Sequence, residues 1–232
     1  MSALRQSGFS SYDDPNFVRN AVNDGRHREA VGGMWDEMGS LQAEFLRTQG
    51  LLPHHALVDV GAGAFRAGVK LISYLDPGNY YAIDLAAEFL EAGYKREIEP
   101  AGLAERFPRR NFAATGAFDL SSFQRRFDFG IAQSVFTHMP IERLSLCLPA
   151  IQPYFNAGGK FFATVFLVPE GKARKRFKQL PGGVVTAPDR DPFHTTLTAL
   201  HAVASQADGW RMSVIGNWNH PRNQQMVLFT RL

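Results

Sequence analysis

The sequence of 232 residues contains one cysteine, Cys147, and no long apolar run. A single cysteine cannot form an intramolecular disulfide or a cysteine-based zinc site, and it favours a reducing compartment. The longest clean apolar run, residues 161–168, is far shorter than the roughly 20 residues that cross a bilayer. The first 16 residues lack the apolar segment of a secretory signal. These absences predict a cytoplasmic protein with no membrane partner.

The sequence also has little excess of charge of either sign. Lys and Arg number 25 against 22 Asp and Glu, which gives a net charge of +3. That excess is too small for a protein that coats nucleic acid, but it is compatible with an anionic ligand. The length suits one domain over residues 1–232. Within it we expect a frayed polar tail over residues 1–15, a helical extension over 16–52 and a core over 53–232.

Several common catalytic motifs are missing. The sequence has no Gly-x-Ser-x-Gly, no Walker loop and no His-x-x-x-His pair, and its seven histidines are scattered. These gaps argue against a serine hydrolase, a P-loop nucleotidase and a helical zinc site. We therefore predict no metal site.

After Pro53, short apolar runs alternate with helical segments. Strands are expected at 56–60, 79–84, within 111–118, at 127–134, 160–168, 210–216 and 224–232, and helices at 66–75, 86–99, 141–155 and 196–207. Alternation of apolar strands with helices predicts a parallel sheet covered on both faces. The last two strands are joined by a short turn, so they must pair antiparallel. The expected fold class is α/β, a Rossmann-like doubly wound sheet of seven strands with an antiparallel edge strand and an N-terminal helical extension.

Three further local features carry expectations. Gly32-Gly33 should separate two helices within residues 16–49. Pro149 and Pro153 should break the helix over 141–155 into pieces. Residues 169–193, rich in Pro, Gly, Lys and Arg, should form a long loop.

A glycine-rich turn, VDVGAGAFRAG, covers residues 58–68 after the first strand of the core. Gly61 and Gly63 allow positive φ and a close approach of the backbone to a ligand, and Asp59 can orient an ammonium group. Arg66 stands where a dinucleotide-binding motif has its third glycine, which weakens the nicotinamide interpretation. A tight turn without any ligand is the alternative.

Two more aspartates follow expected strands. Asp84 ends the second strand, where its carboxylate can accept both hydroxyls of a ribose, and capping of the next helix is the alternative. Asp119 comes shortly after the third strand. For Asp119 a plain helix cap is nearly as well supported as a ligand contact.

Together these segments resemble the class I S-adenosylmethionine-dependent methyltransferases. Asp59, Gly61 and Gly63 match motif I of that family, with Phe65 in place of its third glycine. RRFDFGIAQSVFTHMP resembles the fourth motif, and FNAGGKFFATVF resembles the turn into the fifth strand. Five such matches occur in the family's order over residues 56–168. The segments GGMWDEMGSLQAEFLRTQGLLP, YLDPGNYYAID and NHPRNQQMVLF are similar to a bacterial subgroup associated with polysaccharides or secondary metabolites.

The resemblance implies S-adenosylmethionine as the cofactor and an EC 2.1.1 transferase activity. The implied cofactor residues are Asp59, Gly61, Ala62, Gly63, Arg66, Asp84, Leu85, Phe118, Asp119, Gln133 and Ser134. In the family, an acidic residue at the Asp119 position contacts the adenine amino group, with an apolar neighbour, here Phe118, against the ring. The expected acceptor is an oxygen or nitrogen of a small molecule or glycan.

Two other functions stay open. A nucleic-acid methyltransferase fits the basic pI of about 9.1, although the Asn/Asp-Pro-Pro-aromatic motif of amino-directed enzymes is missing and the small net charge disfavours it. A non-catalytic nucleotide-binding module is the other alternative.

Residues outside the cofactor motifs suggest the chemistry. His138 follows the fourth strand, and a neutral imidazole there can act as general base, or it can simply pack or cap the next helix. For the acceptor, which the basic residues suggest is anionic, the candidates are Phe136, Lys175, Arg176, His220 and Arg222. Lys175 and Arg176 belong to KARKRFK, residues 172–178, which can equally be a solvated loop. Trp35 and Gln42 are candidates for part of a lid. The alternative for Trp35 is a side chain that anchors the core.

Overall fold

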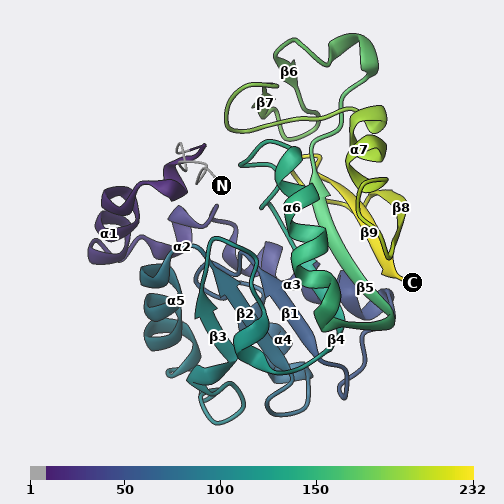
Figure 1. The fold of residues 1–232 in the computed structure, drawn as a ribbon. Helices are drawn as coiled ribbons and strands as arrows, with labels where there is room; N and C mark the ends of the chain where they lie inside the picture. The colour runs from purple at the N-terminus through teal and green to yellow at the C-terminus, as the bar shows by residue number, and fades with distance from the viewer. Residues whose placement is uncertain (1–8) are drawn as a thin grey trace, which may run out of the picture.

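The computed structural model describes residues 9–232. Seven strands form one sheet in the order β3-β2-β1-β4-β5-β9-β8 (Figure 1). Their bounds are Leu57–Val60 for β1, Tyr80–Asp84 for β2, Phe112–Ala114 for β3, Phe127–Ala132 for β4, Phe155–Val165 for β5, Trp210–Asn217 for β8 and Gln225–Arg231 for β9. The first five are parallel, and β9 runs antiparallel between β5 and the edge strand β8. The predicted Rossmann-like α/β sheet with an antiparallel pair at one edge is confirmed.

Five helices cover the two faces of this sheet: α3 (Trp35–Thr48), α4 (Gly68–Tyr74), α5 (Ala87–Gly93), α6 (Glu142–Ile151) and α7 (Leu197–Ala204). The two helices before them, α1 (Pro15–Asn23) and α2 (His27–Ala30), lie outside that layer, and Val18 and Ala21 of α1 pack against Phe89 of α5. Because strand side chains alternate between faces, Leu57 joins the core cluster under α3, α4 and α5, whereas Val58 joins the cluster under α6 and α7. Among the helices of residues 9–232, none has the length and apolarity to cross a membrane.

The strand order reverses between β1 and β4, and this reversal positions the site. In doubly wound sheets the crevice at the carboxyl ends of the strands beside such a reversal is where ligands bind. The chain leaves β1 at Val60 and β4 at Ala132, so the glycine turn and the segment around His138 start from neighbouring strand ends.

The N-terminal segment departs from the sequence-based prediction. The helical stretch contains three helices and not two, because Gly25, with φ 73°, follows α1, and the expected break at Gly32-Gly33 separates α2 from α3. Residues 9–14 were expected to belong to a frayed tail, but Ser11–Asp13 form a 3-10 turn whose Asp13 carboxylate accepts the N–H groups of Phe9 and Ser10. Residues 1–8 of that expected tail lie outside the described residues.

Two predictions about the second half were wrong. Pro149 does not break its helix, since it lies inside α6, whereas the expected break at Pro153 is present, because α6 ends at Ile151 and Gln152–Tyr154 form a 3-10 turn. The burial of Leu144, Leu148 and Ile151 in the core, about 1.5–3 kcal/mol for each side chain, offsets the cost of about 3 kcal/mol for an interior proline. Residues 169–193 are also more than a loop, because β6 (Phe177–Lys178) and β7 (Val185–Thr186) pair antiparallel within them.

Candidate active site

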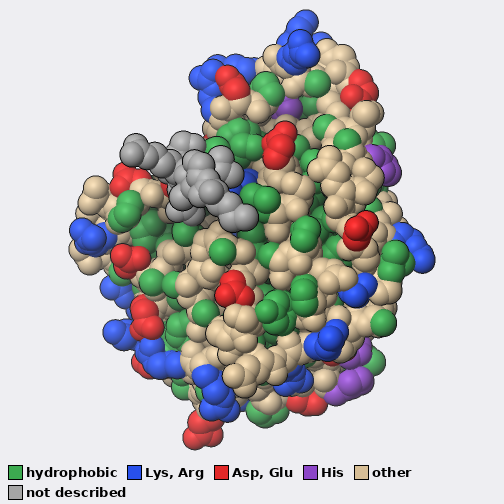
Figure 2. All heavy atoms as spheres, in the orientation of Figure 1, with side chains coloured by type: hydrophobic (Ala, Val, Ile, Leu, Met, Phe, Trp, Pro, Cys, Tyr) green, Lys and Arg blue, Asp and Glu red, His purple; other side chains and the backbone are tan. Residues whose placement is uncertain are grey.

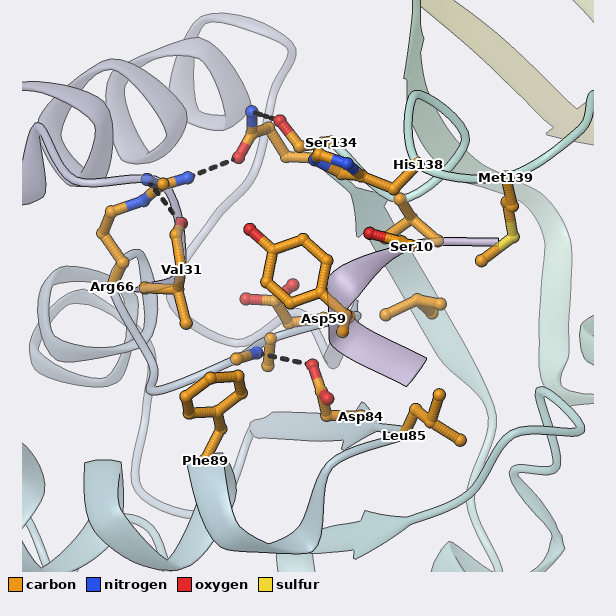
Figure 3. Close-up of a pocket in the computed structure, with 18 of the residues that line it drawn as sticks. Ser10, Val31, Asp59, Arg66, Asp84, Leu85, Phe89, Ser134, His138 and Met139 are labelled. Carbon is orange, nitrogen blue, oxygen red and sulfur yellow. Dashed lines mark hydrogen bonds between the residues drawn. The ribbon is translucent and has the colours of Figure 1, made fainter. Parts of the chain in front are cut away.

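A cavity of about 230 Å³ opens at the carboxyl ends of β1, β2 and β4. Figure 3 shows Asp84 and Leu85 at one end, Ser134 and His138 at the other, and Asp59 between them. The N-terminal turn contributes Phe9, Ser10, Tyr12 and Asp13 to the lining. The cavity is therefore elongated, and the glycine turn lies along it. Residues 9–13 form its N-terminal cover.

The glycine turn has the backbone that its sequence predicted. Gly61 and Gly63 have φ of 75° and 56°, and Phe65 has φ of 66° although it is not a glycine. Phe65 is completely buried and packs edge-to-face on Phe107 and Phe112. Its side chain points into the core and not into the cavity. Phe65 therefore holds a left-handed backbone conformation, while its ring stabilises the core.

Asp84 fixes the glycine turn to the end of β2. Its Oδ2 accepts the Gly63 N–H at 2.8 Å (Figure 3). Its Oδ1 accepts the Ala86 N–H at 2.8 Å. Burial raises the pKa of this carboxyl, and the N–H groups of Ala86, Gly63 and Leu85 oppose the rise. Since each carboxylate oxygen can accept a second hydrogen bond, Asp84 can hold the Gly63 and Ala86 N–H groups and still offer acceptors to a diol in the cavity.

Asp59 is a buried carboxyl at the centre of the cavity. Its Oδ2 accepts the Tyr80 hydroxyl at 2.7 Å. Burial raises the pKa of Asp59 to about 7, with the Tyr80 hydrogen bond acting against the rise and the charge of Asp84 adding to it. Asp59 can thus gain a proton near neutral pH, and a cation arriving beside it would favour the ionised form.

Arg66 spans from the glycine turn to the N-terminal extension. Its guanidinium donates to the carbonyl of Val31 at 3.1 Å, to that of Gly33 at 2.9 Å and to Oε1 of Gln133 at 2.7 Å. Burial lowers the pKa of Arg66 to about 10, so it stays cationic at neutral pH. Arg66 is the cationic wall of the cavity opposite Asp59.

The end of β4 carries a polar network. The Ser134 N–H donates to Oγ1 of Thr164 at 2.8 Å, and the Thr164 hydroxyl donates to Oε1 of Gln224 at 2.7 Å. Gln133 and Ser134 line the cavity, as does Gln42 from α3, whose amide donates to Gln133. Gln224 was not predicted from the sequence, because a glutamine before a closing strand gives no signal of its own.

His138 lies at the opposite end from Asp84, in the segment between β4 and α6. Its Nδ1 is 2.7 Å from Oδ1 of Asp191, and the ring of Tyr12 meets its ring edge-to-face with centroids 5.0 Å apart. Both Tyr12 and Asp191 were missed by the sequence reasoning. Tyr12 lies in a polar stretch interpreted as a tail, and Asp191 follows two other charged residues in an expected loop.

The turn between β8 and β9 also reaches the cavity. His220 and Arg222 line it, and the Arg222 guanidinium donates to the Gly32 carbonyl at 2.9 Å. Burial and the charges of Arg222 and Arg66 lower the pKa of His220 to about 3, so its imidazole is neutral. Arg222 therefore joins the C-terminal turn to the α2–α3 connection.

Most of the predicted residues meet at this cavity. Those in its lining are Asp59, Gly61, Ala62, Gly63, Arg66, Asp84, Leu85, Phe118, Gln133, Ser134, His138, His220 and Arg222. Asp119, Phe136, Lys175 and Arg176 are not in the lining.

Each of these four has another environment. The Asp119 carboxylate is exposed and accepts the N–H and hydroxyl of Ser121, and these hydrogen bonds lower its pKa. Phe136 is buried behind Phe118, with ring centroids 6.1 Å apart. Lys175 and Arg176 are exposed, and Figure 2 shows Lys and Arg side chains gathered over the protruding β6–β7 region.

Two further points bear on the earlier expectations, the position of Trp35 and the arrangement of possible metal ligands. Trp35 is absent from the lining and lies beneath the guanidinium of Arg28, 4.9 Å from the ring centroid. It therefore forms neither a lid nor a fully buried anchor. Within residues 9–232 no group of three or more His, Cys, Asp or Glu side chains is arranged to hold a metal ion.

No protein-family model matches this sequence. Solved structures do resemble it. Magnesium protoporphyrin IX methyltransferase from Synechocystis PCC 6803, with bound SAM, aligns with a TM-score of 0.55 and 13% identity over 98% of this chain and 92% of that one. An O-methyltransferase family protein from Burkholderia thailandensis aligns with a TM-score of 0.63 and 12% identity, over 97% of this chain and 63% of that one. Phosphoethanolamine N-methyltransferase 1 from Haemonchus contortus, in complex with phosphoethanolamine and S-adenosylhomocysteine, aligns with a TM-score of 0.59 and 16% identity. That alignment covers 96% of this chain and 49% of the other.

At these identities the likeness concerns the fold. The chain has the fold of the S-adenosylmethionine-dependent methyltransferases, as its resemblance to the class I family predicted.

Proposed function

We propose that the protein is an S-adenosylmethionine-dependent methyltransferase that acts on an oxygen or nitrogen of a small anionic molecule. The observation that carries this proposal is the pairing of the Asp84 carboxylate with the glycine turn, beside buried Asp59, in one elongated cavity. These carboxylates, which accept hydrogen bonds, suit a ligand with a diol at one end and an amino acid group farther along.

The residues of the cavity fit such a cofactor along its length. Asp84 offers carboxylate oxygens to ribose hydroxyls, with Leu85 and Phe118 as apolar walls beside it. Asp59 matches an ammonium group, and the Arg66 guanidinium matches a carboxylate. S-adenosylmethionine, when bound, supplies an electrophilic methyl group on a sulfonium.

The chain must then align the acceptor and keep water out. Alignment of two reactants accounts for a large share of the rate in a displacement of this kind. His138 stands at the end of the cavity away from Asp84, with the ring of Tyr12 from the N-terminal turn against it. His138 is the side chain placed to take a proton from a hydroxyl or amine acceptor.

The anionic character of the acceptor rests on Arg143. Its guanidinium lies over the ring of Phe9, 5.3 Å from the centroid, and both residues line the cavity. Within residues 9–232 Arg143 forms no ion pair, whereas Asp191 is engaged by His138 and Ser10. A carboxylate or phosphate on the acceptor would neutralise this charge beside the base. In support, the Haemonchus contortus phosphoethanolamine N-methyltransferase 1, which has a similar fold, is in complex with phosphoethanolamine, a small phosphate-bearing molecule.

The test uses methyl-labelled S-adenosylmethionine and matched phenols and amines, each with and without a carboxylate or phosphate. We expect label in the anionic members of the pairs. Arg143→Gln should raise the acceptor KM about tenfold or more, as expected for a lost hydrogen bond to a charged group. The exposed loop variant Arg176→Gln is the control and should leave KM within about twofold, because its charge is screened by solvent. Equal labelling of neutral and anionic acceptors would contradict the anionic assignment.

A further inference from the structure

Asp191 connects two parts of the cavity that are far apart in sequence. It lies between β7 and α7, and its Oδ1 is 2.7 Å from Nδ1 of His138. Its other oxygen, Oδ2, accepts the Ser10 hydroxyl at 2.6 Å. One carboxylate therefore contacts both the residue assigned as base and the segment that covers the cavity.

The contact with Asp191 determines which nitrogen of His138 carries the proton. An ionised carboxylate only accepts hydrogen bonds, so the neutral imidazole must place its proton on Nδ1. The other nitrogen, Nε2, then has a free lone pair, and within residues 9–232 no protein atom hydrogen-bonds to it. Since His138 lines the cavity, this is the tautomer that can accept a proton from an acceptor.

The ring of His138 is also held from the side of the N-terminal turn. Tyr12 packs edge-to-face against it, and Phe9 packs edge-to-face on Phe193, two residues beyond Asp191, with centroids 6.5 Å apart. The backbone N–H of Phe193 donates to the carbonyl of Thr137, next to His138, at 2.7 Å. The Asp191 loop, the cover and the His138 segment are thus joined at one point.

The neighbouring aspartate shows that this arrangement is specific. Asp189 pairs with the adjacent Arg190, and both side chains are 66% exposed. The side chains of His138 and Asp191 are only 29% and 22% exposed. Exposed pairs such as the first contribute little, whereas the second is shielded and engages both carboxylate oxygens.

We infer that Asp191 is the positioning residue for His138: it holds the imidazole as the Nδ1–H tautomer and fastens the N-terminal cover over the acceptor end of the cavity. The inference rests on the proposed methyltransferase function for its catalytic meaning, but the tautomer itself can be measured without any acceptor.

The experiment reads the tautomer of His138 by two-dimensional ¹⁵N–¹H NMR of the full chain, uniformly labelled with ¹⁵N, at a pH where the ring is neutral. Loss of one set of signals in His138→Gln assigns the resonance among the seven histidines. We expect Nδ1–H in the wild type. In Asp191→Asn the amide can turn its NH₂ toward Nδ1, and in Asp191→Ala the partner is gone, so both variants should shift the ratio toward Nε2–H by about tenfold or more.

Asp189→Asn is the matched control and should keep the wild-type ratio. An Nε2–H ring in the wild type, or an unchanged ratio in both Asp191 variants, would overturn the inference. Titration of each variant with S-adenosylhomocysteine separates the two proposals. Unchanged affinity with an altered tautomer supports positioning, whereas wild-type protein that does not bind the ligand refutes the proposed function and leaves the tautomer result standing.

Discussion

The buried carboxyl of Asp59 leads to the most discriminating prediction about the cofactor end of the cavity. Its pKa is raised from 3.8 to about 7, first by burial. The folded protein therefore holds this proton more tightly than the unfolded chain does. The resulting stabilisation is present below about pH 4 and is lost as pH rises through 7. With about 1.4 kcal/mol for each pKa unit, an ionised Asp59 lowers the free energy of unfolding by up to about 4 kcal/mol.

The substitution Asp59→Asn removes the charge and keeps the shape and the acceptor for the Tyr80 hydroxyl. We expect its free energy of unfolding to match that of the wild type near pH 4 and to exceed it above about pH 7. Denaturant titrations at a series of pH values measure this difference directly.

Ligand binding should show the opposite preference. If the ammonium group of S-adenosylhomocysteine pairs with ionised Asp59, wild-type affinity must rise with pH up to about 7, by as much as about tenfold per pH unit. Asp59→Asn should bind about ten- to hundredfold more weakly above that pH, the equivalent of about 1.5–3 kcal/mol for a hydrogen bond to a charged group.

Isothermal titration from about pH 5.5 to 8.5 spans the Asp59 transition. Asp84 also has a raised pKa, so the comparison of interest is the difference in slope between wild type and variant. Parallel pH dependences in the two proteins would refute the assignment of Asp59 to the ammonium group.

Three other substitutions test separate parts of the site. Asp84→Ala should weaken S-adenosylhomocysteine binding about ten- to hundredfold, whereas Asp119→Ala, outside the cavity lining, should leave the dissociation constant within about twofold; equal losses would contradict the ribose assignment. Phe65→Gly should lose a few kcal/mol of stability, since about 3–5 kcal/mol of core packing is offset only by about 1 kcal/mol of relieved backbone strain. Its affinity for S-adenosylhomocysteine should stay within a few-fold, and a loss above about tenfold would place the ring on the ligand. With an acceptor identified from the labelled panel, His138→Gln should lower kcat at least about 100-fold with cofactor affinity unchanged, and a variant within about fivefold of wild type would mean that alignment alone suffices.

The meeting of the residues that we assign to the cofactor could be predicted from the sequence because they lie at or just after strand ends. Asp59, Gly61 and Gly63 lie at the end of β1, and Asp84 ends β2. Apolar runs identify such strands, and the parallel arrangement brings their carboxyl ends to one edge. The chemistry of the residues just beyond each run is then sufficient to place a ligand there.

The acceptor half could not be predicted in the same way. Tyr12 precedes the first helix by only a few residues, and Asp191 is 53 positions from the histidine that it contacts. Their positions depend on packing between irregular segments, which leave no periodic signal in a sequence. The same limit explains why a substrate role was predicted for KARKRFK, residues 172–178, although the cations that line the cavity are Arg66, Arg143 and Arg222.

The central claim is that this cavity binds S-adenosylmethionine and its product. The most direct measurement is a calorimetric titration of the full chain with S-adenosylhomocysteine and, separately, with NAD, together with thermal melts at saturating ligand. We expect saturable binding of S-adenosylhomocysteine and a higher melting temperature, because a ligand that binds only the folded state stabilises it, and we expect no binding of NAD. Binding of NAD in its place, or no shift with S-adenosylhomocysteine at any concentration, would contradict the proposed function.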